Sequence, residues 1–156
     1  MNKRIFIFLI FLLTGCSNIE GFIVDKEEGK ILVVSTNPND TNNSKDRAVD
    51  YPAVWISTNE KKYQLGQKVK AYYDSMEESY PGQTTSKRIN ILKSTKPSKA
   101  DLSEQDVIQV LLNENEDLEI PVIKEIIYQD NKDYWDVTVI SNDEELYFQI
   151  EDKPLN

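Results

Sequence analysis

The chain has 156 residues, a length typical of one domain or of two small ones. It contains no histidine and a single cysteine, Cys16. These two facts exclude histidine-dependent catalysis, an intrachain disulfide and a cysteine-rich metal site, and we expect neither a cofactor nor enzymatic activity. The net charge of −9 opposes binding to nucleic acid, which we do not expect as a partner.

The N-terminus has the pattern of a secretory signal. Lys3 and Arg4 precede an apolar run, Ile5–Leu13, which as a helix would rise only about 14 Å and could not span a bilayer core of about 30 Å. The four residues Leu13-Thr14-Gly15-Cys16 then resemble the bacterial lipoprotein box. In that family the signal is cut before the cysteine, here between Gly15 and Cys16, and the cysteine is acylated. An ordinary signal peptide with an incidental cysteine is the alternative.

Charge divides the rest of the chain into two halves. Residues 17–96 hold 12 basic and 11 acidic side chains, whereas residues 97–156 hold 4 and 16. A polar stretch with a proline in its middle separates them at 94–100 and is typical of a linker. We therefore expect a signal peptide over 1–15, a lipidated tether over 16–20, a first domain over 21–93 and a second over 101–153.

The first half predicts an all-β unit. In Lys68–Asp74, the fourth of the expected strands, Val69, Ala71 and Tyr73 alternate with polar neighbours, as in a half-buried strand. The fifth strand places Ile89 and Ile91 inward. Short strands without a helix favour a five-stranded OB-like barrel, because closure removes exposed edges. The expected strands are Gly21–Asp25, Ile31–Ser35, Ala53–Ser57, Lys68–Asp74 and Thr85–Leu92.

The second half predicts one helix and an antiparallel meander. Ser103 and Asp106 have the spacing of a capping box, and an apolar stripe follows them. Turn residues separate the three later strands, Val122–Tyr128, Tyr134–Ser141 and Glu145–Ile150. A helix that covers three strands makes a small α+β unit, so the whole chain is expected to be α+β.

Two resemblances to known families accompany these patterns. Four segments of the first half carry the first resemblance: Gly21-Phe22-Ile23-Val24, Ile31-Leu32-Val33-Val34-Ser35, Gly66-Gln67-Lys68-Val69-Lys70 and Glu78-Ser79-Tyr80-Pro81-Gly82-Gln83. Through them residues 21 to about 92 resemble the YobA-like family, a domain of unknown function in Gram-positive lipoproteins, which implies an OB-type barrel and no known activity. The second half resembles a PepSY-type module through Tyr134-Trp135-Asp136-Val137 and Tyr147.

The first candidate binding site is the turn around Tyr80. Tyr80 would be an aromatic contact on a rigid loop, with Glu78 and Gln83 as polar partners. The alternative is structural: Pro81 and Gly82 set the turn while Tyr80 covers the end of the barrel.

The second candidate is the outward face of the fourth and fifth strands. It carries interleaved basic and aromatic side chains, namely Lys68, Lys70, Tyr72 and Arg88. Outside the cell such a face suits an anionic wall polymer or a lipid head group better than nucleic acid. A plain solvated strand face is the alternative.

Two acidic groups suggest other chemistry. Asp130, Asp133 and Asp136 could offer oxygen ligands to calcium, but the loop lacks the glycine and the terminal glutamate of an EF-hand loop, and a plain hairpin turn explains it better. Asp74 and Glu78 could serve a carboxylate-dependent hydrolase, but their segment is predicted as a strand end and a turn.

The function that we expect from the sequence is a non-catalytic binding module at the cell envelope. A lipid at Cys16 would hold it to the outer face of the membrane, and its partner would be an envelope protein or a cell-wall ligand. The alternatives are a PepSY-type protease inhibitor and, less well supported, the carboxylate hydrolase.

Overall fold

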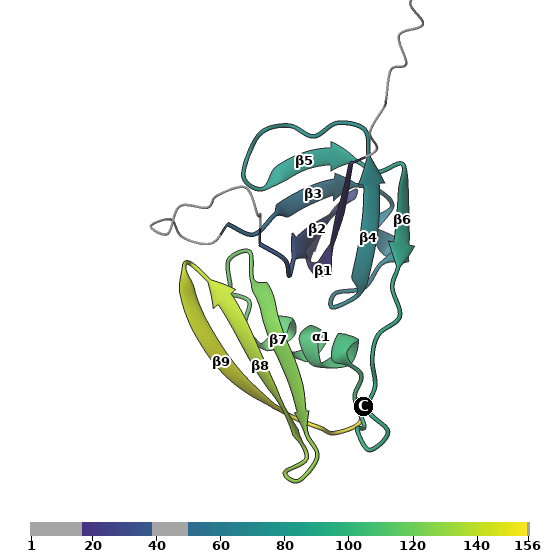
Figure 1. Ribbon diagram of the computed structural model, residues 1–156. Helices are drawn as coiled ribbons and strands as arrows, with labels where there is room; N and C mark the ends of the chain where they lie inside the picture. Colours follow the sequence, from purple (N-terminus) through teal and green to yellow (C-terminus); the bar gives the residue numbers. More distant parts are fainter. Residues whose placement is uncertain (1–16, 39–49, 156) are drawn as a thin grey trace, which may run out of the picture.

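The computed structural model describes residues 17–38 and 50–155, and within them the fold is mostly β with one α-helix (Figure 1). The lipoprotein box and Cys16 lie outside the described residues. A six-stranded mixed sheet comprises β1 (Ser17–Glu27), β2 (Lys30–Ser35), β3 (Ala53–Ser57), β4 (Lys68–Tyr73), β5 (Gly82–Thr85) and β6 (Arg88–Ile91). The helix α1 (Glu104–Glu114) follows, and then a three-stranded antiparallel sheet of β7 (Val122–Gln129), β8 (Tyr134–Ser141) and β9 (Glu144–Glu151). A short 3-10 helix, η1 (Glu60–Lys62), precedes β4.

The first sheet is strongly curled. Its order is β5-β3-β2-β1-β4-β6, antiparallel except for the parallel pair β3 and β5. A flat sheet would separate its edge strands β5 and β6 by about 24 Å. Only Ser86 and Lys87 connect these strands, however, and the link from Thr85 to Arg88 reaches about 11 Å at most. The sheet must therefore bend until its two edges approach each other.

The prediction of a closed five-stranded barrel needs correction. Between the described strands no ladder joins β5 to β6, so the sheet has two edges and six strands. The expected fifth strand, Thr85–Leu92, is two strands that pair with different partners. Ile89 packs inward as predicted, but Ile91 is 52 % exposed, because β6 is an edge strand with no neighbour beyond it.

Both faces of β2 are buried, which explains its unbroken apolar run. Ile31 and Val33 point into the curl of the first sheet, in a cluster with residues of β1, β3 and β4. Leu32 and Val34 point the other way, into a second cluster that contains α1 and the three-stranded sheet. A strand covered on both sides has no solvated face, so it needs no polar alternation.

The helix α1 begins at the predicted capping box. The backbone N–H of Ser103 donates to Oδ2 of Asp106 at 2.8 Å, and the N–H of Asp106 donates back to Oγ of Ser103 at 3.3 Å. Val107, Ile108 and Leu111 on this helix are fully buried. Figure 1 shows α1 between the two sheets, so its apolar side chains help to join them into one core.

The stretch 94–100 is attached to the start of α1. Oγ of Ser94 accepts a hydrogen bond from the backbone N–H of Gln105 at 3.0 Å. The carbonyl of Thr95 accepts one from the backbone N–H of Glu104 at 2.9 Å. Ala100 is buried in the core shared by the two sheets. The stretch predicted as a linker therefore contributes a residue to the hydrophobic core that the two sheets share.

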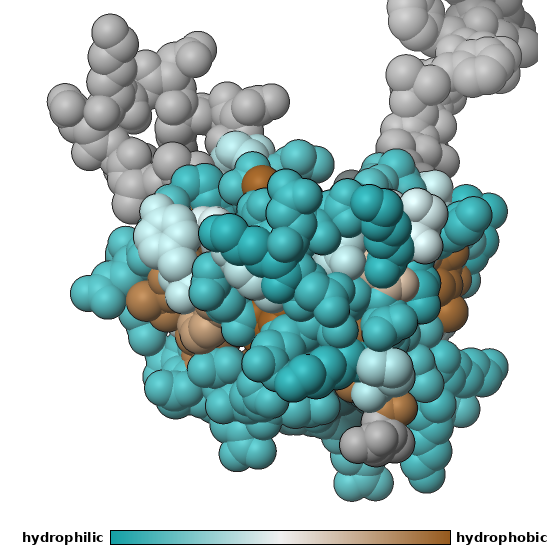
Figure 2. Space-filling model, turned by 90° about the horizontal axis from the view of Figure 1, so that it is seen from below, coloured by the Kyte–Doolittle hydropathy of each residue, from teal (hydrophilic) through white to brown (hydrophobic). Residues whose placement is uncertain are grey.

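The surface seen from below in Figure 2 is predominantly hydrophilic, with hydrophobic residues visible in separate places. Within the described ranges, none of the helices has the length and apolar character needed to cross a membrane.

Candidate functional site

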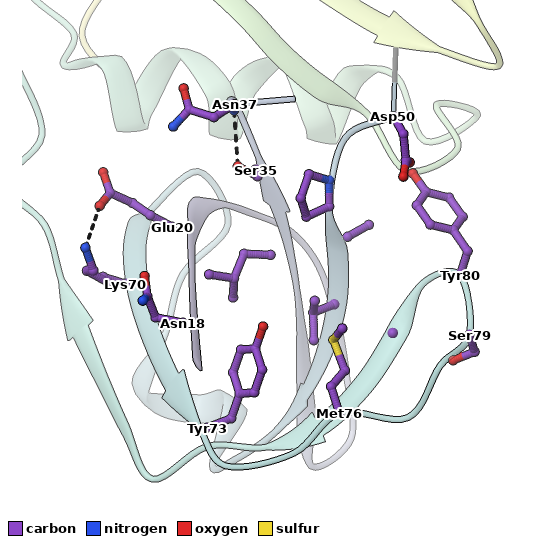
Figure 3. A pocket seen from close by; sticks show the side chains of 15 residues that line it. Asn18, Glu20, Ser35, Asn37, Asp50, Lys70, Tyr73, Met76, Ser79 and Tyr80 are labelled. Atoms are coloured by element: carbon purple, nitrogen blue, oxygen red, sulfur yellow. Dashed lines mark hydrogen bonds and ion pairs between the residues drawn. The ribbon is translucent and has the colours of Figure 1, made fainter. Parts of the chain in front are cut away.

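A pocket of about 520 Å³ lies at one end of the curled sheet, beside the start of β1 (Figure 3). Strands β1 to β4 contribute to its wall, and the loop between β4 and β5 closes the other side. Most of the side chains that line it can form hydrogen bonds, among them Asn18, Glu20, Ser35, Asn37, Asp50, Lys70, Tyr73, Ser79 and Tyr80.

One wall of the pocket carries an ion pair between neighbouring strands. Nζ of Lys70 on β4 lies 3.4 Å from Oε2 of Glu20 on β1, because these residues are opposite each other in the register. Nζ of Lys68 lies 3.8 Å from the other oxygen of Glu20. The single carboxylate offsets one of the two positive charges, so the three side chains together keep a net charge of +1.

The opposite wall is formed by Tyr80 and Asp50. The Tyr80 ring is 61 % exposed, and in Figure 3 its hydroxyl points toward Asp50. This hydroxyl donates to the carbonyl of Tyr51 at 3.4 Å. Partial burial raises the pKa of Tyr80, and the negative charges of Asp50 and Asp143 raise it further, so the phenol stays protonated and can donate.

The floor of the pocket is less polar. Tyr73, the last residue of β4, is 8 % exposed, and burial raises the pKa of its hydroxyl. Met76 lies beside it in Figure 3. The pocket therefore combines an apolar floor with hydrogen-bonding walls, a combination typical of sites for small polar ligands.

The residues predicted around Tyr80 do not gather at one place. Tyr80 lines the pocket, whereas Glu78 is exposed in the same loop and does not. Gln83 pairs through its backbone carbonyl with the N–H of Glu77 at 2.9 Å and faces a different hollow.

The basic and aromatic residues predicted on the outward face of β4 share that face. Lys68, Lys70 and Tyr72 alternate with buried residues along the strand. The guanidinium carbon of Arg88 on β6 lies 4.4 Å from the centre of the Tyr72 ring. Of this group only Lys70 also lines the pocket.

The two acidic groups have partners within the fold. Asp130 pairs with Lys99 at 2.7 Å, and Asp136 accepts from Gln129 and Gln149. No group of residues suited to hold a metal ion occurs in the described part of the chain. Asp74 pairs with Lys87 at 2.6 Å, and Glu78 lies apart in the loop that follows.

Several pocket residues were not among the predicted candidates. Asn18 and Glu20 precede the expected first strand, and Asp50 ends a long segment without a recognisable motif. Nothing in the local sequence indicates that Asp50 lies near Tyr80. Only the register of β1 with β4 and the path of the loop after β4 bring these residues together.

One comparison with known proteins concerns the first sheet. Residues 20–93 match the family described as a protein of unknown function (DUF3221). No curated protein matches the sequence. The PepSY-type character of the second half and the lipoprotein signal stay predictions.

Two solved structures of the YobA protein of Bacillus subtilis are similar to the chain. The crystal structure at 1.55 Å resolution has 17 % identity and a TM-score of 0.36, and the match covers 51 % of this chain and 97 % of that one. The solution structure of YobA residues 21–120 has 18 % identity and a TM-score of 0.36, with coverage of 59 % and 93 %.

Proposed function

We propose that this protein is a non-catalytic binding module on the outer face of the cell membrane, anchored by a lipid at Cys16. Its pocket at the end of the curled sheet would bind a hydroxyl-rich glycan of the cell wall. The observation that carries the proposal is the composition of this pocket: an exposed tyrosine faces amide, hydroxyl and carboxylate groups around an apolar floor.

The charges of the pocket favour a neutral glycan over an anionic polymer. Lys70 is already paired with Glu20, and Asp50 on the opposite wall would repel phosphate groups. A sugar ring can stack on Tyr80 while its hydroxyls exchange hydrogen bonds with Asn18 and Asn37.

The proposal extends to the fold around the pocket. Strands β5 and β6 resemble the two halves of one strand that would close an OB-like barrel, because one pairs with β3 and the other with β4. On this interpretation the pocket lies at the mouth of the barrel, where ligand sites are common.

Cosedimentation with purified Gram-positive cell-wall sacculi tests the function. The full-length protein in a non-ionic detergent is expected to bind sacculi, and Tyr80→Ala to weaken this binding about tenfold, since an aromatic contact at the centre of a site commonly contributes that much. Tyr147→Ala is the matched control, because Tyr147 is 75 % exposed and lies outside the pocket. Equal losses for the two variants would refute the pocket as the site.

Sacculi stripped of phosphate-linked polymers identify the ligand. Binding that survives stripping supports the glycan, whereas binding that disappears would contradict it and point to an anionic polymer.

The lipid anchor is tested separately. Cys16→Ser should move the protein from the membrane fraction to the soluble fraction without changing its binding to sacculi.

A further inference from the structure

A second hollow, of about 620 Å³, lies between the first sheet and the segment that connects α1 to β7. Its lining residue Pro81 is the chain neighbour of Tyr80 and Gly82, which line the pocket described above. We refer to it as the inter-sheet groove. The outer face of the first sheet contributes one side, and the end of α1 with the segment 116–121 contributes the other. Trp55, Ile120 and the carboxylates of Asp25, Glu116 and Glu119 are among the residues that line it.

The floor of the inter-sheet groove belongs to the shared core. Val24, Leu32 and Leu112 are buried members of that core. Trp55 and Ile120 are partly buried and pack against it. The floor can therefore offer a fixed apolar surface to a side chain that enters the groove.

Hydrogen bonds to Ser141 and within the segment fix residues 116–121, which form one wall of the groove. Oγ of Ser141, a buried residue on β8, accepts from the backbone N–H of Glu119 at 3.1 Å and donates to its carbonyl at 3.0 Å. The N–H of Leu118 donates to the carbonyl of Asn115 at 3.2 Å. These bonds preform the groove, which lowers the ordering cost of binding.

The charged side chains that line the groove are all acidic, although Nζ of Lys30 lies 4.4 Å from the centre of the Trp55 ring. Asp25, Glu116 and Glu119 are exposed carboxylates on its rim, and among the described residues that line it none is basic. The last turn of α1 also lacks a basic residue, so the negative end of its dipole, at Asn115, is not neutralised. These charges together attract cations and repel phosphate and carboxylate groups.

Trp55 already binds one cation within the protein. Nζ of Lys30 lies 4.4 Å from the centre of the Trp55 ring and is also paired with Glu27 at 2.9 Å. This contact shows that the acidic surroundings of the indole accommodate an ammonium group on its face.

We propose that the inter-sheet groove binds an extended, positively charged peptide segment of a partner protein. An apolar side chain of the segment would rest on the floor near Trp55, and flanking lysine or arginine side chains would pair with Asp25, Glu116 and Glu119. The proposal is independent of glycan binding, because the two hollows share no lining residue.

Fluorescence anisotropy with two labelled peptides tests the proposal. The probe is the hexapeptide Gly-Lys-Leu-Lys-Val-Lys, and its counterpart carries glutamate at the three lysine positions. The full-length protein in a non-ionic detergent is expected to bind the lysine peptide and not the glutamate peptide. Absence of binding by the lysine peptide up to about millimolar concentration, the weak limit for a specific contact, would overturn the proposal.

Paired charge reversals locate the binding. The double variant Glu116→Lys, Glu119→Lys should weaken binding of the lysine peptide about tenfold or more. The control Glu114→Lys, Asp117→Lys changes the net charge equally at exposed positions outside the groove and should have little effect. Equal losses of affinity in both double variants would show that the peptide is attracted to the acidic half as a whole. This result would overturn the proposal that the groove is the binding site.

A neutral variant distinguishes the loss of negative charge from a loss of folded structure. Glu116→Gln, Glu119→Gln removes the charges with little change in shape, and its thermal melting should match that of the wild type. We expect it to reduce affinity in the same direction as the charge reversal. A variant that melts normally and binds the lysine peptide as well as the wild type would refute the role of these carboxylates.

Discussion

Asp152 is the buried carboxylate that connects the end of β9 to the start of α1. It is 2 % exposed and accepts hydrogen bonds from the backbone N–H groups of Asp101 and Leu102, at 2.6 and 2.8 Å, and from Nε1 of Trp135 at 2.9 Å. Burial alone would raise its pKa, but the three donors and the positive charge of Lys96 together outweigh burial, and the pKa is lowered. The residue therefore stabilises the fold in its ionised form.

The lowered pKa predicts a pH dependence of stability. A carboxyl group whose pKa is lower in the folded state than in the unfolded state contributes its stability above the unfolded value, here 3.8, and loses it as the pH falls through the folded value. Asp152→Asn should lower the free energy of unfolding at pH 7 by about 2–3 kcal/mol, because an amide cannot accept all three hydrogen bonds. The difference from the wild type should shrink below pH 4.

Urea unfolding at pH 7, 5, 4 and 3 measures this effect. Glu151→Gln is the control, because Glu151 is exposed and its pairing with Lys153 is a surface ion pair of little value. A difference between Asp152→Asn and the wild type that is the same at every pH would contradict the assignment.

Among the connecting elements, the loop that leads into β4 is packed tightly against α1. Gly66 has a φ of 78°, and a Cβ atom at this position would lie 2.4 Å from the carbonyl oxygen of Gln105. The side-chain amide of Gln105 also donates to that of Gln64 at 3.0 Å. This loop is therefore a fixed contact between the first sheet and the helix, and it requires glycine for both conformation and space.

A comparison of Gly29 with Gly66 separates the cost of the left-handed conformation from the cost of the close contact with α1. Gly29, in the turn between β1 and β2, has a φ of 77°, but nothing lies within 4 Å of the place where its Cβ would be. Gly29→Ala should cost about 1 kcal/mol, the price of the left-handed conformation alone. Gly66→Ala should cost about 2–4 kcal/mol, because the helix must also move. Thermal unfolding of both variants measures the difference, and equal costs would refute the close contact with α1.

Most elements could be predicted from local patterns, because each depends on neighbours in the chain. Ala53–Ser57 and Tyr134–Ser141 have the predicted bounds, and the capping box at Ser103 forms as expected. The break of the last predicted strand at Ser86 and Lys87 could not be predicted. It depends on pairing with β3 on one side and β4 on the other, which the local pattern does not encode.

The candidate site was harder to predict than the fold. Tyr80 and Lys70 were identified because an aromatic in a Pro-Gly turn and a lysine on a half-buried strand are visible in the sequence. Glu20 reaches the pocket through the register of β1 with β4, and Asp50 meets Tyr80 there through the path of the loop after β4. The inter-sheet groove depends on packing between the two halves, and no single segment of the sequence indicates it.

At the scale of the whole molecule, the two sheets share one hydrophobic core. Phe22, Leu32 and Val34 on the outer face of the first sheet belong to the same buried cluster as Leu111 on α1 and Val139 on β8. Without the second half, these first-sheet side chains would be exposed to water, at a cost of about 25 cal/mol for each Å². The sharing of the core thus makes each half depend on the other for its stability.

This dependence predicts that the two sheets unfold together. Val33→Ala removes two methyl groups from the inside of the curled sheet, and Val139→Ala removes them from the second sheet; both side chains are fully buried. Each variant should lower the global free energy of unfolding by about 2 kcal/mol. Native-state hydrogen exchange should then show the same loss of protection at the slowest amides of β2 and of β8, whichever valine is changed. If Val139→Ala lowered protection in β8 and left β2 unchanged, the halves would be separate folding units, and ligands in the inter-sheet groove could not stabilise both.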